Sequence, residues 1–336
     1  MPVAVEFDRV SIVFGERPET ALPLMDAGRS RAEIKEETAQ VLGVHDCSLS
    51  VATGEILVLM GLSGSGKSTM LRAVNGLNPV CRGEVRISDG AGMVSVTHAD
   101  AATLRQLRLT RVAMVFQAFG LLPWRTVREN VGLGLELARL AQPERRERVD
   151  AQLELVGLAD WAERKVGELS GGMQQRVGLA RAFATDAPIL LMDEPFSALD
   201  PLIRARLQDE LLELQGKLKR TIIFVSHDLD EAFKLGNRIA LMEGGRIVQC
   251  GSARDIIADP VDEYVADFVA HMNPLGVLTA TDVAVEGHAP GAPEVAAEIP
   301  VREVMALLAA SPELNVAGGG RISRESVLAR LINPHG

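Results

Sequence analysis

The run 61–69 is a glycine-rich loop with the chemistry of a phosphate-binding site. It follows an apolar strand and precedes a helical segment, which is the context that the pattern G-x-x-x-x-G-K-[ST] needs. The glycines let backbone N–H groups and the next helix N-terminus face a phosphate. Lys67 would bring positive charge to the β and γ phosphates, and the Ser68 hydroxyl would bind Mg²⁺. The residues expected to bind the nucleotide here are Gly61, Leu62, Ser63, Gly64, Ser65, Gly66, Lys67, Ser68 and Thr69.

Polar residues follow three other apolar runs, each at a point where a strand is expected to end. Asp193 and Glu194 follow one run, Gln117 follows another, and His227 follows the third. Because ligands bind at the carboxyl ends of parallel strands, these side chains should gather at the phosphate loop. Asp193 is expected to hold Mg²⁺, and Glu194 to polarise the attacking water. Gln117 would reach the metal or the water, and His227 would sense the γ-phosphate.

The run 169–176 begins with Leu-Ser-Gly-Gly and predicts a capped helix. Ser170 is the expected cap, and Gly171 and Gly172 leave the helix N-terminus bare enough to meet a phosphate. The phosphate loop already supplies one helix N-terminus to the chain's own nucleotide. A second one makes sense if it faces the nucleotide of another copy, so this run predicts a dimer.

Strands that alternate with helices predict an α/β fold with a largely parallel, helix-flanked sheet. A helical block over 118–168 interrupts the alternation, and a short amphipathic helix is expected within 31–42. The composition changes from residue 274, and the Gly- and Pro-rich stretch 287–293 predicts a linker. The expected strands are 3–7, 10–14, 47–51, 56–60, 112–116, 189–192 and 221–225.

Bulk properties narrow the function classes. The chain has 336 residues, 47% of them hydrophobic, and a net charge of −10, which argues against non-specific nucleic-acid binding. Its three cysteines form no C-x-x-C pair, which suits a reducing cytosol and argues against a disulfide framework or zinc ribbon. We find no signal peptide and no apolar run of about 18 residues, so a membrane role would need a partner.

Taken together, these motifs resemble the ATP-binding subunit of an ABC transporter over residues 1 to about 272. The resemblance implies a P-loop NTPase cassette with an N-terminal antiparallel β subdomain, a parallel-sheet core and an inserted helical subdomain over 118–168. It also implies that Phe14 stacks on adenine. The resemblance further implies catalytic roles for Lys67 and Gln117. It makes Glu194 the catalytic base and His227 the switch residue.

Two further segments gain roles only through this resemblance. The loop 197–200, ending at Asp200, would link the two nucleotide sites of a dimer. The segment 118–130 would touch the coupling helix of an integral membrane permease. A substrate-binding protein would then be an indirect partner, and the chain would lie peripherally on the cytoplasmic face of the plasma membrane.

Within that family, the chain is similar to importers of glycine betaine, proline and choline. The similarity rests on 60–70, on 196–204, on Met173 and on the excursion 15–46 with its Gly-Val-His-Asp end. Many such importers carry two cystathionine-β-synthase-type (CBS) domains after the cassette.

Residues 273–336 are too few for a complete CBS pair, and only 319–328 resembles the end of one such domain. We therefore expect a linker over 273–300 and a short extension over 301–336 that is a remnant of a CBS-type domain. The short tail resembles choline-type members and favours that type.

Two alternatives use the same ATP chemistry. A soluble ABC ATPase that acts on ribosomes or DNA usually has two cassettes or coiled-coil arms and a basic surface. An exporter subunit would share the motifs but lack the excursion 15–46. The single cassette, the acidic charge and that excursion favour an importer.

Overall fold

The structure is a computed structural model that describes residues 2–117, 120–197, 199–270, 275 and 277–332. Contacts divide the chain into two compact units. One contains Met1–His227 and Ala240–Ile247, and the other contains Asp228–Ile239 and Val248–Gly336. Residue 272, where we expected the cassette to end, lies outside the described residues.

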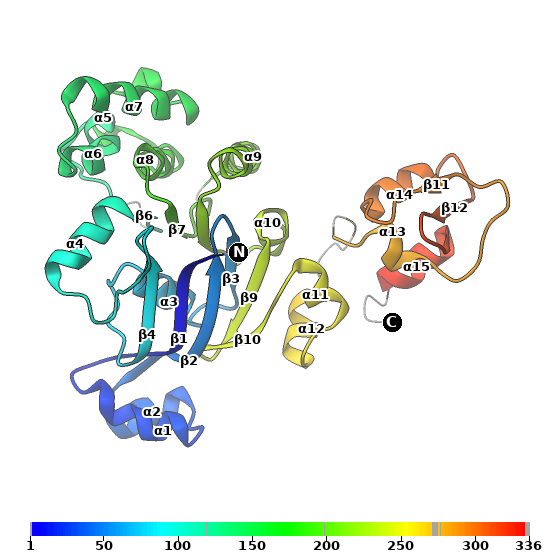
Figure 1. The fold of residues 1–336 in the computed structure, drawn as a ribbon, viewed down its shortest axis with the longest axis horizontal. Helices are drawn as coiled ribbons and strands as arrows, with labels where there is room; N and C mark the ends of the chain where they lie inside the picture. Colours follow the sequence, from blue (N-terminus) through cyan, green and yellow to red (C-terminus); the bar gives the residue numbers. More distant parts are fainter. Residues whose placement is uncertain (1, 118–119, 198, 271–274, 276, 333–336) are drawn as a thin grey trace. The chain divides into compact units, whose positions relative to one another are not determined.

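A six-stranded sheet in the order β10-β9-β3-β8-β7-β6 forms the core of the fold (Figure 1). The four strands β3, β8, β7 and β6 run parallel to one another. Three of them are buried along their whole length, which explains their continuous apolar sequences. The strands are β3 (Ile56–Met60), β6 (Val112–Val115), β7 (Ile189–Asp193), β8 (Thr221–Val225), β9 (Arg238–Glu243) and β10 (Arg246–Gly251).

A second, antiparallel sheet has the order β2-β1-β4-β5. The two short strands expected at the start of the chain are one strand, β1. Its pairing register with β2 shifts between Phe7 and Val10, where Arg9 has a positive φ of 48°. A bulge of this kind bends a strand without ending it. The strands are β1 (Val3–Phe14), β2 (Val41–Ala52), β4 (Arg82–Ser88) and β5 (Met93–Ser95).

The excursion between β1 and β2 holds η1 (Pro18–Ala21), α1 (Leu22–Asp26) and α2 (Arg31–Thr38). The expected helix over 31–42 is therefore shorter than predicted. It ends because Ala39 adopts a left-handed conformation, and Val41 already belongs to β2.

An apolar cluster holds together the helical layer drawn in green in Figure 1. Its helices are α5 (Val127–Val131), α6 (Leu133–Leu137) and α7 (Gln142–Leu155), and they pack against α8 (Gly171–Ala184). The cluster thus continues past residue 168 into α8. Other elements of this unit are α3 (Lys67–Ala73), α4 (Ala101–Thr110), η2 (Ala159–Trp161), η3 (Val166–Glu168) and α9 (Pro201–Leu218).

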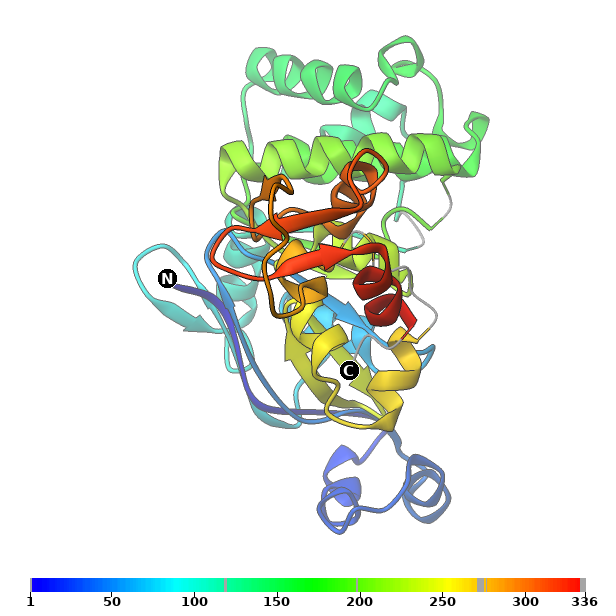
Figure 2. The same ribbon diagram turned by 90° about the vertical axis from the view of Figure 1, so that its right-hand side faces the viewer.

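The C-terminal residues pack around their own apolar cluster, drawn in orange and red in Figures 1 and 2. The linker expected over 273–300 is wrong for the described residues, because Leu278, Val283 and Val295 are buried in this cluster. The Gly- and Pro-rich stretch is a loop held in place by Asn315, whose side chain bonds Ala289 at both its N–H and its carbonyl, each at 2.9 Å. Turn residues here mark a tight loop inside a folded unit.

That unit contains a three-stranded sheet in the order β11-β12-β13. Its elements are α10 (Leu229–Leu235), α11 (Ala253–Ala258), α12 (Glu263–Val269), α13 (Ala280–Val283), β11 (Glu294–Val295), α14 (Val301–Leu307), β12 (Glu313–Val316), β13 (Arg321–Ser323) and α15 (Arg324–Ile332).

Candidate functional site

A cavity of about 830 Å³ opens beside the phosphate loop, at the carboxyl ends of the parallel strands. It gathers nine of the predicted site residues, six from the loop and three from strand ends, together with Phe14. Gly61, Leu62, Ser65 and Asp193 are not among its lining residues. The lining residues are Phe14, Arg31, Ala32, Lys35, Val41, Leu42, Gly43, Ser63, Gly64, Gly66, Lys67, Ser68, Thr69, Gln117, Glu194 and His227.

The backbone of the phosphate loop needs glycine at two positions. Gly61 has a φ of 139°, and an added Cβ would lie 2.1 Å from the Met242 carbonyl oxygen. Gly66 has a φ of 105°, and its Cβ would lie 2.7 Å from the Gly43 carbonyl oxygen. Both contacts are with backbone, so no side-chain rotation would relieve them. The two glycines keep the loop tight against β2 and β9.

The helix α3 begins at Lys67, whose side chain points back to the phosphate loop. Its Nζ donates to the carbonyls of Gly61 at 2.7 Å and Leu62 at 2.9 Å. Burial lowers the pKa of Lys67, and the carboxylates of Glu194 and Asp193 act against that shift. The ammonium is therefore a largely desolvated charge beside the loop, where an anion would gain most from it.

Asp193 ends β7 fully buried, and two side chains of α3 hold it. The Ser68 hydroxyl donates to Asp193 Oδ1 at 2.6 Å, and Arg72 donates to Oδ2 at 2.8 Å. We did not predict Arg72. Its signal in the sequence is its position four residues after Ser68, which places both on one helix face.

The hydroxyl of Ser68 and the carboxylate of Asp193 are hard oxygen ligands of the kind that Mg²⁺ prefers. Among the described residues, no group of three or more His, Cys, Asp or Glu side chains could hold a metal ion. A Mg²⁺ ion held by one carboxylate and by substrate phosphates needs no such group. The residues present therefore fit this ion.

Glu194 meets side chains from two other strand ends. Gln117, after β6, donates its Nε2 to Glu194 Oε2 at 3.2 Å, and His227 Nδ1, after β8, lies 3.4 Å from the same oxygen. Glu194 has a positive φ of 48°, an uncommon conformation for a residue that is not glycine. Its carbonyl accepts from Gln175 Nε2 of α8 at 3.4 Å, a contact we did not predict.

The structure does not bring the Leu-Ser-Gly-Gly run or Asp200 into this cavity. Ser170 caps α8 by accepting from the Met173 N–H at 3.4 Å, and Asp200 caps α9 by accepting from Ile203 at 3.1 Å. Ser170 and Asp200 are exposed. The preceding loop was predicted as 197–200, and residue 198 within it lies outside the described residues. Both helix starts are therefore available to another molecule.

The excursion also reaches the cavity, which we did not predict. Phe14 ends β1 with 38% of its surface exposed, and an added Cβ on Gly43 would lie 2.9 Å from its ring. Arg31 of α2 donates to the carbonyl of Gly64 and, at 2.8 Å, to that of Gly43. Only the fold reveals these contacts, because 33 residues separate Arg31 from Gly64.

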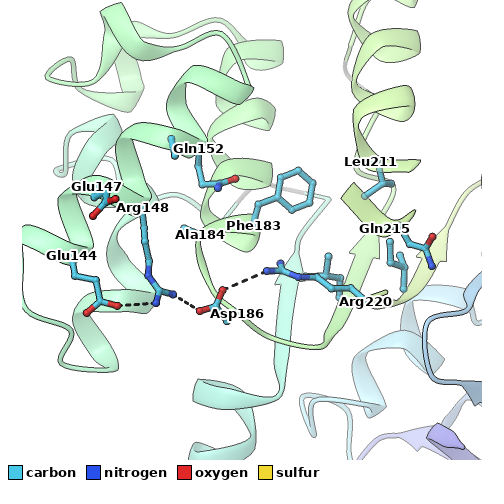
Figure 3. A pocket seen from close by; sticks show the side chains of 13 residues that line it. Glu144, Glu147, Arg148, Gln152, Phe183, Ala184, Asp186, Leu211, Gln215 and Arg220 are labelled. Atoms are coloured by element: carbon cyan, nitrogen blue, oxygen red, sulfur yellow. Dashed lines mark hydrogen bonds and ion pairs between the residues drawn. The ribbon is translucent and has the colours of Figure 1, made fainter. Parts of the chain in front are cut away.

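A second cavity of about 540 Å³ lies at the opposite, amino ends of β7 and β8 (Figure 3). A chain of charges crosses it, in which Asp186 lies between Arg148 and Arg220. No predicted site residue lines it. It is therefore separate from the phosphate site.

Comparisons with known proteins show the family of the chain. A family model described as "ABC transporter" matches residues 44–197. The chain is 48% identical over 284 residues to "Glycine betaine/proline betaine transport system ATP-binding protein ProV" of Salmonella typhimurium, covering 84% of this chain and 70% of the relative. The chain belongs to the ABC transporter family. As an ABC transporter ATP-binding protein, it binds and hydrolyses ATP.

This ABC transporter protein is also similar to a second relative and to a solved structure. It is 40% identical over 227 residues to "Choline transport ATP-binding protein OpuBA" of Bacillus subtilis, covering 67% of this chain and 58% of the relative. It matches the "Dimeric structure of a post-hydrolysis state of the ATP-binding cassette MJ0796 bound to ADP and Pi" with a TM-score of 0.64 and 30% identity, covering 74% of this chain and 98% of that one. Of the helices that the structure describes, none is both long and apolar enough to cross a membrane.

Proposed function

We propose that this chain is the ATP-hydrolysing subunit of an ABC importer for quaternary amines. The observation that carries the catalytic part is the meeting of Gln117, Glu194 and His227 beside the phosphate loop. The names of similar proteins support the transport part. Identity is higher to the glycine betaine protein than to the choline protein, so glycine betaine is the favoured cargo. These names favour import over export and over action on ribosomes or DNA.

In the proposed nucleotide complex, Phe14 stacks on adenine and the N–H groups of 61–69 face the phosphates. Lys67 exchanges its two carbonyl partners for phosphate oxygens, which it meets with little competing water. Ser68 and Asp193, with Gln117 nearby, would hold Mg²⁺, which supplies charge neutralisation at the β and γ phosphates.

Glu194 is the proposed base that orients and polarises the attacking water. Gln117 and His227 share its Oε2, so they fix the direction of that carboxylate before water arrives. His227 is well exposed and free to face a γ-phosphate at the mouth of the cavity. Hydrolysis thus depends on positions set by three separate strand ends, as expected for phosphoryl transfer by placement and charge.

We also propose a dimer with two bound ATP molecules. Ser170, Gly171 and Gly172 of each chain would face the nucleotide of the partner, together with Asp200. The exposure of Ser170, Gly171 and Asp200, and the absence of all four residues from the chain's own cavity, support this arrangement. ATP then binds the closed dimer better than the open one, which drives closure.

The proposed contact with the membrane permease is the segment 118–130, of which 118 and 119 lie outside the described residues. Trp124 supports it, because 67% of this side chain is exposed and aromatic residues are enriched in interfaces. A substrate-binding protein would act indirectly, and the chain would lie at the cytoplasmic face of the membrane. Residues 1–272 would form the cassette, with 118–168 as its helical subdomain, and the C-terminal unit would contain a CBS-type remnant.

The catalytic proposal is tested with Glu194→Gln, which keeps the shape of the side chain and removes its base. We expect ATP binding to persist, hydrolysis to fall by at least about a hundredfold and a dimer to accumulate with ATP. Glu154→Gln, an exposed position on α7, makes the same charge change and serves as the control. A Glu194→Gln protein that stays monomeric with ATP and permease present would refute the sandwich.

The cargo is tested by uptake into vesicles that contain the chain, its permease and its binding protein. Glycine betaine, choline and proline compete for entry in the same assay. We expect glycine betaine to be taken up with ATP and choline to compete less well. If no quaternary amine enters while ATP is hydrolysed, the cargo is wrong and the ATPase assignment stands.

A further inference from the structure

The helix α2 places two positive side chains on the wall of the nucleotide cavity. Arg31 and Lys35 both line it, and they stand one helical turn apart on the same face. We infer that Arg31 and Lys35 bind the phosphates of a nucleoside triphosphate, so the excursion is part of the nucleotide site. This inference rests on the proposal that the cavity holds ATP.

Arg31 bridges two parts of the cavity. One guanidinium nitrogen donates to the Gly43 carbonyl, close to Phe14 and the proposed adenine position. The other donates to the Gly64 carbonyl within the phosphate loop. The side chain thus lies between the adenine end and the phosphate end, opposite the α-phosphate of a nucleotide that spans them.

The bonding of Arg31 leaves capacity for a ligand. A guanidinium has five N–H donors, and the two carbonyl bonds use only part of this set. Its Nε is buried and has no hydrogen-bond partner among the described residues. The two carbonyls hold the planar guanidinium group in place, so little side-chain entropy remains to be lost when an anion binds.

Lys35 differs from Arg31 in its surroundings. It is exposed, and among the described residues its ammonium makes no ion pair or hydrogen bond. The acidic neighbours Glu33 and Glu37 pair instead with Arg29. Lys35 therefore faces the cavity as an uncompensated charge at its rim.

These differences predict different responses to salt. A surface charge acts over roughly a Debye length, about 10 Å at 0.1 M salt and about 3 Å at 1 M, whereas a half-buried hydrogen-bonded charge is screened much less. The contribution of Lys35 to ATP affinity should therefore vanish at high salt. The contribution of Arg31 should persist.

The experiment measures MgATP and adenosine dissociation constants of the full chain by calorimetry, at 0.05 M and 0.5 M salt. For Arg31→Ala we expect the constant for MgATP to rise about tenfold at both salts, as for a lost hydrogen bond to a charged group, with adenosine changed less than about twofold. For Lys35→Ala we expect a rise of about threefold at low salt only. Arg17→Ala removes an exposed charge from the same excursion, outside the cavity, and should change neither constant.

Two results would overturn the inference. One is MgATP binding within twofold of the native chain in Arg31→Ala. The other is an equal loss for ATP and adenosine, which would make Arg31 only a support of the cavity wall. If Arg31→Ala fails to fold, Arg31→Lys replaces it in the test, because lysine keeps the charge but not the planar guanidinium group. Its affinity for MgATP should fall about threefold, with the affinity for adenosine unchanged. A native chain that binds no ATP would refute the proposed function itself.

Discussion

A single buried amide holds the segment that we propose as the permease contact. Asn130 of α5 is completely buried, and its Nδ2 donates to the carbonyls of Thr126 at 2.9 Å and Leu122 at 3.1 Å. Its Oδ1 accepts from the Leu122 N–H at 2.8 Å. Three good hydrogen bonds therefore fix the loop that carries Trp124.

The perturbation is Asn130→Asp, which keeps the size of the side chain and replaces its NH₂ by oxygen. The carbonyls of Leu122 and Thr126 each lose this side-chain donor and keep only one backbone N–H, from Arg125 and Asn130. Each lost hydrogen bond costs about 0.5 to 1.5 kcal/mol. Among the described residues, only backbone groups bond the Asn130 side chain, so no cation would pair with the new carboxylate and its desolvation adds to the loss. We expect the free energy of unfolding to fall by about 3 kcal/mol at pH 7.

The sign of the pH dependence follows from the same burial. Desolvation should raise the pKa of the introduced carboxyl above its unfolded value of about 3.9. The folded state then binds more protons than the unfolded state between these two values, so the free energy of unfolding falls as pH rises through this window. The penalty should be smallest at low pH, where the protonated acid can donate once.

The assay is urea unfolding of the native and variant chains across pH 4 to 8, with limited proteolysis of the 120–130 loop. Gln142→Glu makes the same charge change at the exposed start of α7 and should cost nothing. A loss below about 0.5 kcal/mol that does not vary with pH would refute the reasoning, because it would mean that these hydrogen bonds carry no net stability.

Two further predictions concern charge and burial. Burial raises the pKa of the Cys47 thiol from 9.0 to about 11, so the folded state holds this proton more tightly. The free energy of unfolding should then fall by about 2 to 3 kcal/mol from pH 9 to 11, and Cys47→Ala should flatten this part of the curve in chemical denaturation. At the second cavity, Asp186 pairs with Arg148 and Arg220 but is mostly exposed, so Asp186→Asn should cost at most about 1 kcal/mol. That loss should shrink at 1 M salt. A loss above about 2 kcal/mol that does not change with salt would contradict the view that these ion pairs are screened by solvent.

Local sequence patterns predicted several elements whose interactions are themselves local. Fully apolar runs marked β3, β7 and β8, because strands covered on both faces bury every side chain. The cap Ser170 was predicted from its own neighbours, since a cap bonds a residue three positions away. The same signals failed at Arg9 and at 287–293, where turn-like residues form a bulge and a loop inside folded structure.

The residue types of the site, and their places at strand ends, were determined by the sequence alone. Gln117, Glu194 and His227 meet as predicted, because parallel strands deliver their carboxyl ends to one edge of the sheet. Only the tertiary structure decided that Arg31 and Arg72 reach this site. Their partners lie 33 and 121 residues away, and such contacts depend on which surfaces pack together rather than on any local period.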